Sequence, residues 1–239
     1  MISKNQQKFI RGLEQKKFRR REHLFVAEGP KVVGDLIKAG FRPQALFSTT
    51  EQSDAQLVTE DELRRISFLQ HPQQVLALFP LPEPTLQQPQ QGHLYLALDG
   101  VQDPGNLGTI IRLADWYGID TIYCSEDTAD AWAPKVVQAT MGSIARVKVV
   151  YTSLCDLLDN TALPVYGTLL DGNDIYQEEL TADGIIVMGN EGNGISADIR
   201  QKVSRRLLIP SFHQGDTAES LNVAIATAIT CSEFRRRQD

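Results

Sequence analysis

The chain has 239 residues, of which 42% are hydrophobic and 23% charged, and its net charge is −6. This composition is typical of a soluble globular protein, and the length suits one large domain or two of ordinary size. No apolar run is long enough to span a bilayer and the N-terminus is polar, so we expect a cytoplasmic protein that does not enter a membrane.

The cysteine and histidine positions argue against a metal site. The three cysteines, Cys124, Cys155 and Cys231, are widely spaced, and the four histidines are scattered. An odd number of separated cysteines supports neither a disulfide framework nor a Cys-x-x-Cys site. We therefore expect no bound metal.

Positive charge is concentrated at the N-terminus. Residues 1–24 carry eight cations against two carboxylates, a local charge of +6, so the rest of the chain carries −12. A basic segment on an acidic body favours contact with phosphates, although a solvated helix end explains it equally well. The candidate RNA-binding cations are Lys16, Lys17, Arg19, Arg20 and Arg21.

The first third of the chain predicts a small α/β domain over residues 1–79. Pro30 and Gly40 bound one helix, and Thr59 with Glu62 three residues on forms a capping box that begins another. In chain order we expect a strand at 24–29, a helix at 30–40, a strand at 45–50, a helix at 59–69 and a strand at 73–80. The proline- and glutamine-rich segment 80–92 that follows is unsuited to a sheet or a helix and predicts a linker.

The alternation of strands and helices resumes after the linker. The apolar runs are short and nearly free of polar residues, which is typical of a parallel sheet covered on both faces. We expect strands at 94–98, 120–124, 147–151, 165–170, 185–188 and 207–209, with helices after Asn106, after Pro134, around 153–160, after Ser196 and from about Thr217 to Arg236. This pattern predicts a doubly wound, mostly parallel sheet over residues 93–239.

Three polar turns follow strands of this second domain. The first, "DPGNLGTIIRLADWYG", places Asn106 at the turn and Arg112 on the outer face of a helix whose apolar residues face the sheet. The second, "MGNEGNGIS", carries glycines in the order G-x-x-G-x-G, the reverse of the dinucleotide motif. The third, "IPSFHQGDTAESLNVAIATAI", begins a helix near Ser220 and Asn222. Because ligands bind beyond the carboxyl ends of parallel strands, we expect one composite site.

These three stretches, in this order, resemble the signature motifs of the SpoU (TrmH) RNA ribose 2′-O-methyltransferases. The stretch "KFRRREHLFVAEGPKVVGDLI" is similar to the accessory substrate-binding domain of that family. The resemblance implies a C-terminal trefoil knot, which the usual absence of knots in proteins would not predict. It also implies S-adenosylmethionine (AdoMet) as cofactor, RNA as substrate, and a homodimer that builds the active site across its interface.

The resemblance implies roles for individual residues. Asn106 would hold Arg112 and the ribose in register, and Glu191 would orient Arg112 or a loop of the partner subunit. The implied catalytic residues are Asn106, Arg112, Glu191, Ser220 and Asn222. The implied cofactor-binding residues are Thr168, Gly189, Asn190, Gly194, Ile209, Ser220 and Leu221.

Arg112 admits two roles. Proposals for the family make this arginine the general base, whereas a guanidinium keeps its proton up to a pKa above about 12. It would otherwise clamp the target phosphate and stabilise the forming alkoxide, and we favour this second role.

The expected function is methyl transfer from AdoMet to a ribose 2′-hydroxyl of structured RNA, with ribosomal RNA favoured over transfer RNA. The alternative is a non-catalytic RNA-binding protein whose knotted domain serves dimerisation. Two C-terminal features stay open. The arginines 235–237 are RNA contacts or helix-end cations, and a stripe on the last helix is a dimer contact or ordinary core. The stripe consists of Leu221, Ala224, Ile225, Ala228 and Ile229.

Overall fold

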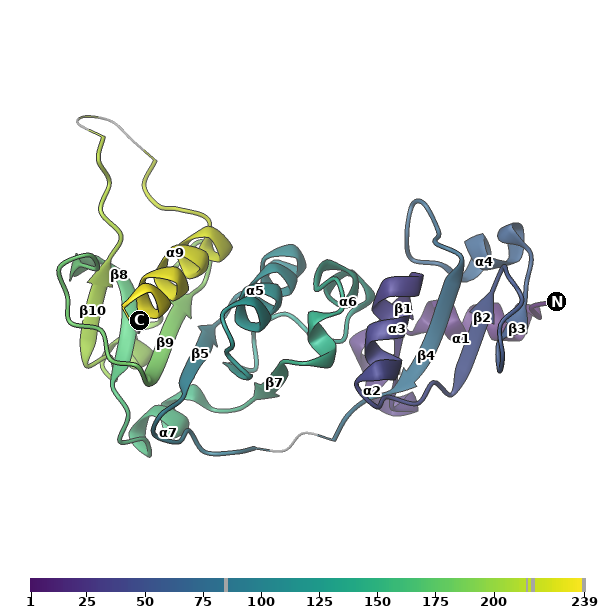
Figure 1. The fold of residues 1–239 in the computed structure, drawn as a ribbon, viewed down its shortest axis with the longest axis horizontal. Helices are drawn as coiled ribbons and strands as arrows, with labels where there is room; N and C mark the ends of the chain where they lie inside the picture. The colour runs from purple at the N-terminus through teal and green to yellow at the C-terminus, as the bar shows by residue number, and fades with distance from the viewer. Residues whose placement is uncertain (84–85, 214, 216–217, 238–239) are drawn as a thin grey trace. The chain divides into compact units, whose positions relative to one another are not determined.

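A computed structural model describes residues 1–83, 86–213, 215 and 218–237, and the chain divides into two compact units. Unit 1 comprises Met1–Glu83 and Asp130–Arg146, and unit 2 comprises Pro84–Ala129 and Val147–Asp239. Figure 1 labels most of their helices and strands. None of the helices in the described part of the chain is long and apolar enough to cross a membrane.

Unit 1 holds a mixed four-stranded sheet. Its strands are β1 (Leu24–Glu28), β2 (Ala45–Ser48), β3 (Gln56–Leu57) and β4 (Val75–Pro80), in the order β1-β4-β2-β3. β4 runs antiparallel to both β1 and β2. The helices before residue 83 are α1 (Lys4–Gly12), α2 (Lys16–Glu22), α3 (Pro30–Lys38) and α4 (Glu60–Ile66). Thr59 caps α4 through the predicted capping box.

The basic N-terminus forms two helices that belong to the core of unit 1. Ser3 and Gln6 make a reciprocal capping box at the start of α1, and Ile10 and Leu13 are buried with residues of β1 and α4. The clustered charge of this segment does not by itself predict the bounds of these two helices. The S-x-x-Q pattern was the available signal.

Unit 1 also includes residues 130–146, which lie within the expected domain 93–239. This segment forms α6 (Pro134–Ala139) and a short 3-10 helix, η1 (Ser143–Ala145). Trp132 lies against Phe25 of β1 with 4.6 Å between ring centroids, and Val136 and Val137 are buried. The apolar face of this segment packs with the first unit, so the compact units differ at these residues from the expected domains.

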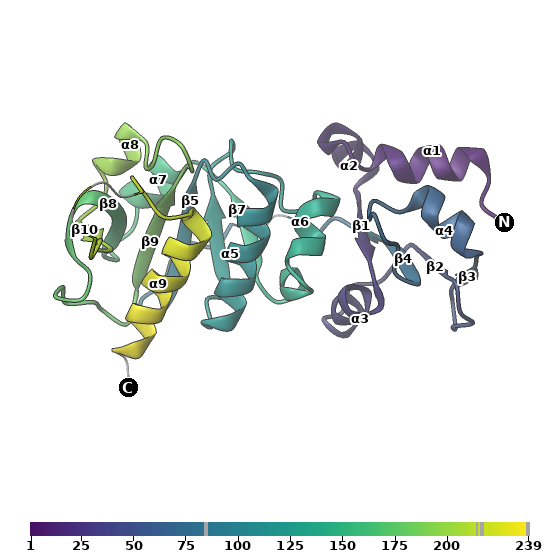
Figure 2. The ribbon, with the colours of Figure 1, turned by 90° about the horizontal axis from the view of Figure 1, so that it is seen from above.

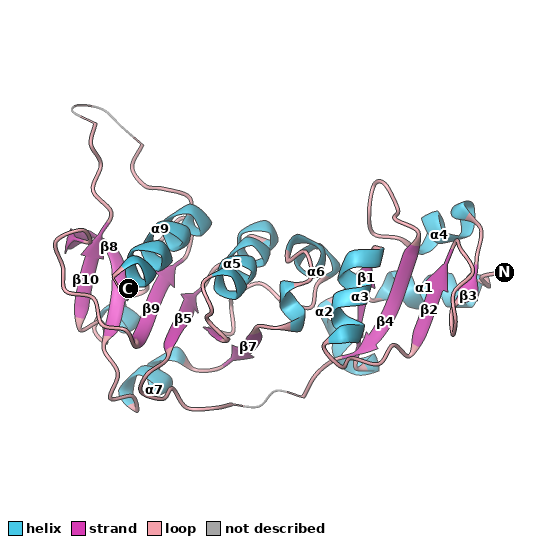
Figure 3. Cartoon of the chain, viewed as in Figure 1, coloured by secondary structure: helices cyan, strands magenta, loops and turns pink. Residues whose placement is uncertain are grey.

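Unit 2 is built on a six-stranded sheet in which every pair is parallel. Its strands are β5 (Leu94–Asp99), β6 (Thr121–Cys124), β7 (Lys148–Tyr151), β8 (Val165–Asp174), β9 (Gly184–Gly189) and β10 (Arg205–Leu208), in the order β10-β8-β9-β5-β6-β7. The helices are α5 (Pro104–Trp116), α7 (Leu154–Asp159), α8 (Ala197–Arg200) and α9 (Val223–Arg236). A helix follows most of these strands along the chain, whereas β8 leads to β9 without one (Figure 3).

The sheet of unit 2 is covered on both faces, which explains its wholly apolar strands. Helices α5 and α9 lie side by side on one face, and α7 and α8 lie on the other (Figure 2). On the second face, Leu154, Leu157 and Ile199 pack against Tyr95, Ala97 and Val187.

The predicted fold class, α/β with a mostly parallel sheet, is confirmed. The predicted knot involves the connection between β10 and α9, in which residues 214, 216 and 217 lie outside the described residues. Residues 84 and 85 of the predicted linker also lie outside them. The last helix begins at Val223 rather than near Thr217, which is itself outside the described residues. Asn222 is therefore the N-cap of α9 and not a residue inside it.

Candidate active site

The first motif turn is fixed by a capped helix at the carboxyl end of β5. Asp103 is the N-cap of α5, and its Oδ1 accepts a hydrogen bond from the backbone N of Asn106 at 2.8 Å. Pro104 occupies the first turn, where its missing N–H costs nothing. Leu107, Ile110, Ile111 and Ala114 are fully buried against the sheet. Arg112 is exposed on the opposite face, as predicted.

The second motif loop is closed by Asn190. Its Oδ1 accepts from the backbone N of Gly192 at 2.9 Å and of Asn193 at 3.0 Å, and its Nδ2 donates to the carbonyl of Gly100 at 2.6 Å. These bonds seat the loop on the chain that leaves β5. Asn190, predicted as a cofactor contact, therefore has its side chain committed to the loop itself.

The three glycines of this loop differ in the space around their Cβ positions. A Cβ on Gly189 would lie 2.2 Å from the backbone C of Gly194, so the tight loop itself requires glycine there. Gly194 has φ +68° and open space around its Cβ position. Gly192 is also open, with Asn190 Oδ1 the nearest atom at 3.6 Å. Only the last two positions thus leave room for a ligand to approach the backbone.

Glu191 reaches from this loop to the start of α5. Its carboxylate accepts from the backbone N of Gln102 at 3.1 Å and of Asp103 at 3.0 Å, and from Asn106 Nδ2 at 3.0 Å. Partial burial raises the pKa of Glu191, but the hydrogen bonds from Asn106 and the two amides outweigh it and hold the pKa below its ordinary value. An ionised carboxylate at a helix N-terminus also interacts favourably with the helix dipole.

Asn106 also forms a hydrogen bond with the third motif. Its Oδ1 accepts from Asn222 Nδ2 at 3.0 Å, and Asn222 Oδ1 accepts from the backbone N of Ala224 at 2.9 Å and of Ile225 at 3.3 Å. Glu191, Asn106 and Asn222, which we call the amide relay, therefore join all three motif loops. The three motif loops therefore meet within a single chain.

The relay has only one hydrogen-bond direction. An ionised carboxylate only accepts, so Asn106 must turn its NH₂ toward Glu191 and its oxygen toward Asn222. Asn222 must then donate to Asn106, which leaves its own oxygen for the amides of α9. Both side-chain amides are thus fixed by the ionisation of Glu191 at one end and the N-terminus of α9 at the other.

Comparison with known proteins identifies the family. The model described as "SpoU rRNA Methylase family" matches residues 93–232, and the model described as "MRM3-like substrate binding domain" matches residues 4–77. The chain belongs to the SpoU family.

Relatives of this SpoU-family chain match it along its whole length. The Bacillus subtilis 23S rRNA (guanosine(2553)-2′-O)-methyltransferase RlmP is 34% identical over 247 residues, covering 98% of this chain and 97% of its own. A putative RNA methyltransferase of the TrmH family from Porphyromonas gingivalis superposes with a TM-score of 0.88 at 43% identity, covering 99% of both chains. An AdoMet-bound rRNA methyltransferase from Sinorhizobium meliloti gives 0.88 at 33% identity, with 99% and 97% covered.

Arg112 stands apart from the amide relay in this SpoU-family chain. No hydrogen bond or ion pair joins Arg112 to another of the described residues. Asn106 and Glu191 bond to each other instead, and the expected contact of Glu191 with a partner subunit's loop stays a prediction. Ser220 is likewise exposed and outside the relay. The relay fixes the backbone that carries Arg112 rather than its guanidinium.

The predicted AdoMet residues lie at one edge of the parallel sheet. Thr168 directly follows the last residue of β8 that pairs with β9, and Gly189 ends β9. Ile209 follows β10, and Leu221 precedes Asn222 with half of its surface exposed. The open Cβ positions of Gly192 and Gly194 and the exposed leucine suit the backbone contacts and apolar surface of a nucleoside, so the residues present fit the cofactor.

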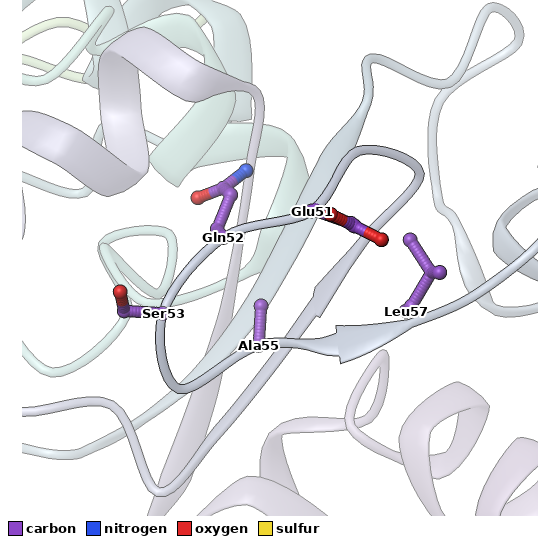
Figure 4. A pocket seen from close by; sticks show the side chains of 5 residues that line it. All are labelled: Glu51, Gln52, Ser53, Ala55 and Leu57. Atoms are coloured by element: carbon purple, nitrogen blue, oxygen red, sulfur yellow. The ribbon is translucent and has the colours of Figure 1, made fainter.

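Two other features carry no part of this site. A shallow hollow of about 460 Å³ in unit 1 is lined by Glu51, Gln52, Ser53, Ala55 and Leu57, none of them a motif residue (Figure 4). Among the described residues, no group of histidine, cysteine and carboxylate side chains could hold a metal ion.

The candidate RNA-binding cations do not form one set. Arg19 is 2% exposed, and its guanidinium donates to the carbonyls of Leu13 and Glu14 and forms an ion pair with Asp130 at 2.5 Å. Arg19 is therefore a structural residue of unit 1, which corrects its assignment. Lys17, Arg20 and Arg21 are exposed on α2, whereas Lys16 is half-buried. Arg21 also stacks over Phe18, 4.5 Å from the ring centroid.

The C-terminal arginines are structural as well. Arg235 donates to the carbonyls of Tyr117 and Gly118, and Arg237 donates to those of Ile175 and Glu178. Arg236 and Arg237 also pair with the buried Glu233, and these ion pairs lower its pKa although burial opposes the shift. This triplet holds the end of α9 in place.

Sequence reasoning missed two carboxylates of the site. Asp103 caps α5, and the pattern of Asp before Pro at a helix start could have identified it. Asp99, 8% exposed at the end of β5, accepts from the backbone N of Ser196 at 2.6 Å. No sequence signal marks that contact, because it joins residues 97 positions apart.

Proposed function

We propose that this chain transfers a methyl group from AdoMet to a ribose 2′-hydroxyl of ribosomal RNA. Its family and its full-length relatives make it an AdoMet-dependent RNA methyltransferase. The ribose as acceptor and ribosomal RNA as substrate are the proposal. RlmP, which matches nearly the whole chain, is named for 2′-O-methylation of 23S rRNA, and this supports both.

The amide relay is the observation that carries the proposal. It brings the three motif loops together at the carboxyl edge of the sheet, where open parallel sheets bind their ligands. Bound AdoMet supplies a methyl group that is already activated by the sulfonium. The chain must therefore position the acceptor and help to remove its proton, and well-aligned reactants can lower a barrier by about 7–11 kcal/mol.

Arg112 is proposed as the group that receives the RNA. It projects from α5 into solvent with no partner among the described residues, so its planar fork is available for a phosphate beside the target ribose. Its fixed positive charge would also stabilise a developing alkoxide.

Because lysine offers only a point charge, we expect Arg112→Lys to lose most of the turnover, measured with saturating AdoMet. Near-full turnover would contradict a bidentate clamp.

We further propose that the chain acts as a homodimer through α5 and α9. Trp116, one turn after Arg112 on α5, is 82% exposed, and Ile225 on the adjacent α9 is 53% exposed. Of the predicted stripe, Ile225 and Leu221 face outward, whereas Ala224 is buried. A second copy covering this face would bring its own residues near Arg112.

Analytical ultracentrifugation should give a dimer for the wild type and a shift to monomer for Trp116→Glu. A monomeric wild type would contradict the proposal.

The proposed substrate is tested with purified ribosomal and transfer RNA that lack the modification. Methylated RNA is subjected to alkaline hydrolysis, which requires a free 2′-hydroxyl, so a 2′-O-methyl group leaves a resistant dinucleotide. We expect such a dinucleotide from ribosomal RNA only. Resistant product from transfer RNA alone would overturn the substrate, and a methylated base that leaves hydrolysis unaffected would overturn the ribose target. AdoMet binding without any transfer would favour the non-catalytic RNA-binding alternative.

A further inference from the structure

The pairing between β8 and β10 shifts in register at residues 168–172 of β8, between two consecutive residues of β10. Arg206 pairs with Gly167 of β8, whereas the next residue, Leu207, pairs with Asn173. The residues between these two pairs, 168–172, form a bulge within β8, which we call the β8 loop.

Both ends of the β8 loop are fixed by glycines. A Cβ on Gly172 would lie 2.5 Å from the backbone C of Leu207, and a Cβ on Gly167 would lie 2.7 Å from Val203 Cγ2. No other residue type fits at either position without a shift of its neighbours. The loop therefore begins and ends at defined points, and only its middle is free to vary.

Asp171 secures that middle. Its Oδ2 accepts from Arg200 Nη2 and from Arg206 Nη1, the latter at 3.1 Å. Arg200 ends α8, which follows the second motif loop, and Arg206 lies in β10, which leads to the third motif. One carboxylate thus ties together three chain segments that meet nowhere else through side-chain charges among the described residues.

The same three segments carry the predicted cofactor residues. Thr168 begins the β8 loop, and its Oγ1 donates to the carbonyl of Val187 at 3.3 Å, two residues before Gly189. The loop therefore starts beside the second motif, and Ile209 lies three residues beyond Arg206. None of the three charged side chains is itself among the expected cofactor contacts.

We propose that Asp171, with Arg200 and Arg206, holds the β8 loop as a preformed wall of the AdoMet site. This inference rests on the proposed placement of AdoMet at the sheet edge. Asp171 is a positioning residue: it acts through the loop and does not touch the reacting atoms. A wall that is already ordered need not be ordered on binding, so the ion cluster favours cofactor affinity and leaves the transfer step unchanged.

The test is AdoMet binding by calorimetry and steady-state kinetics for wild type and Asp171→Asn. Two exposed ion pairs are weak individually, so we expect the Kd and KM for AdoMet to rise about three- to tenfold. The kcat at saturating AdoMet and the KM for RNA should stay within about twofold, and high salt should narrow the difference in Kd. A merely structural role would instead lower the melting temperature and kcat together.

Asp159→Asn is the matched control. Asp159, at the end of α7, is 52% exposed, against 48% for Asp171, and pairs with Lys202 at 2.6 Å. We expect its AdoMet affinity to equal that of the wild type. Arg206→Gln should weaken AdoMet binding as Asp171→Asn does. The double variant Asp171→Asn with Arg206→Gln should lose less AdoMet affinity than the sum of the two single losses, because both substitutions remove the same ion pair.

The outcomes separate this inference from the proposed function. A wild type that binds no AdoMet contradicts the proposed function itself. A wild type that binds, beside an Asp171→Asn variant of equal affinity, overturns the inference alone. Equal weakening by Asp159→Asn overturns it too, because the effect would then be general. If Asp171→Asn does not fold, Arg206→Gln, which keeps the pair to Arg200, gives the same decision.

Discussion

Asn106 is the residue through which the second and third motif loops communicate. Its amide donates to Glu191 and accepts from Asn222, so both of its polar groups are used and neither can be exchanged. An aspartate there would lose the donor toward Glu191 and place two carboxylates side by side. The chemistry of the site at residue scale is therefore set by the direction of one amide.

Asn106→Asp should lower kcat at saturating AdoMet by at least about tenfold, which corresponds to about 1.4 kcal/mol of lost positioning. Asn193→Asp provides the control, since it adds the same charge to the neighbouring loop at a side chain that makes no hydrogen bond among the described residues. Its kcat should stay within about twofold of the wild type. Equal losses in both variants would assign the effect to charge and not to the relay.

Glu191 makes the stability of the site dependent on pH. Its folded-state pKa lies below the ordinary 4.5, because the hydrogen bonds from Asn106 and two amides outweigh the effect of burial. The stabilisation is therefore fully present above pH 4.5 and is lost as the pH falls through the folded-state pKa. The carboxylate is exposed, so the stabilisation amounts to at most about 1 kcal/mol.

Thermal unfolding of wild type and Glu191→Gln at neutral and acid pH measures this effect. The wild type should be the more stable at neutral pH, and the difference should vanish in acid. Glu126→Gln, at an exposed carboxylate with no hydrogen bond among the described residues, should track the wild type at both. A difference that persists unchanged in acid would contradict the role of the ionised carboxylate.

At the scale of elements, α9 begins where the relay ends. Asn222 serves two purposes there, because its oxygen caps the helix and its NH₂ donates to Asn106. A pattern of hydrophobic residues could predict the helix but not this start. The polar residues before Val223 are each acceptable as caps, and only the contact with Asn106 distinguishes Asn222.

The two purposes of Asn222 can be separated by substitution. Asn222→Asp keeps the capping oxygen but loses the donor, so we expect its melting temperature to stay near that of the wild type while kcat falls at least about tenfold. Asn222→Ala loses the cap as well and should be destabilised by about 1 kcal/mol. An active Asn222→Asp variant would limit the residue to capping.

At the scale of the whole molecule, charge divides between an acidic body and a basic N-terminus that is helical. Its cations are not equivalent. The Arg19 side chain is buried and bonded within unit 1, whereas Lys17, Arg20 and Arg21 are exposed on the same helix. Sequence could locate this charge but not divide it. Which side of α2 is buried depends on α1 and on residues 130–146, which meet α2 only in the fold.

Neutralising the exposed cations should weaken RNA binding without affecting the cofactor. In the triple variant Lys17→Gln, Arg20→Gln and Arg21→Gln, RNA affinity should depend less steeply on salt. The magnitude of the slope of log RNA affinity against log salt concentration should fall by roughly 0.7–0.9 for each phosphate contact removed. AdoMet affinity should be unchanged. Arg19→Gln is the comparison on the same helix and should instead lower the melting temperature. An unchanged salt slope in the triple variant would place the RNA contact elsewhere.

Sequence reasoning predicted the parallel sheet and the three motif turns, because these depend on local apolar runs and on turns at strand ends. It did not predict that Glu191 would bind the start of α5 rather than Arg112, or that residues 130–146 would pack with unit 1. Both depend on contacts between residues far apart in the chain, for which a single sequence carries no signal.

Transfer of a labelled methyl group from AdoMet to RNA that lacks this modification, followed by mass analysis of nucleosides, tests the central claim most directly. Wild type is compared with Arg112→Ala, and AdoMet binding is measured for both. We predict a 2′-O-methylnucleoside with the wild type alone and equal AdoMet binding by the two proteins. A methylated base, or equal 2′-O-methylation by Arg112→Ala, would contradict the account.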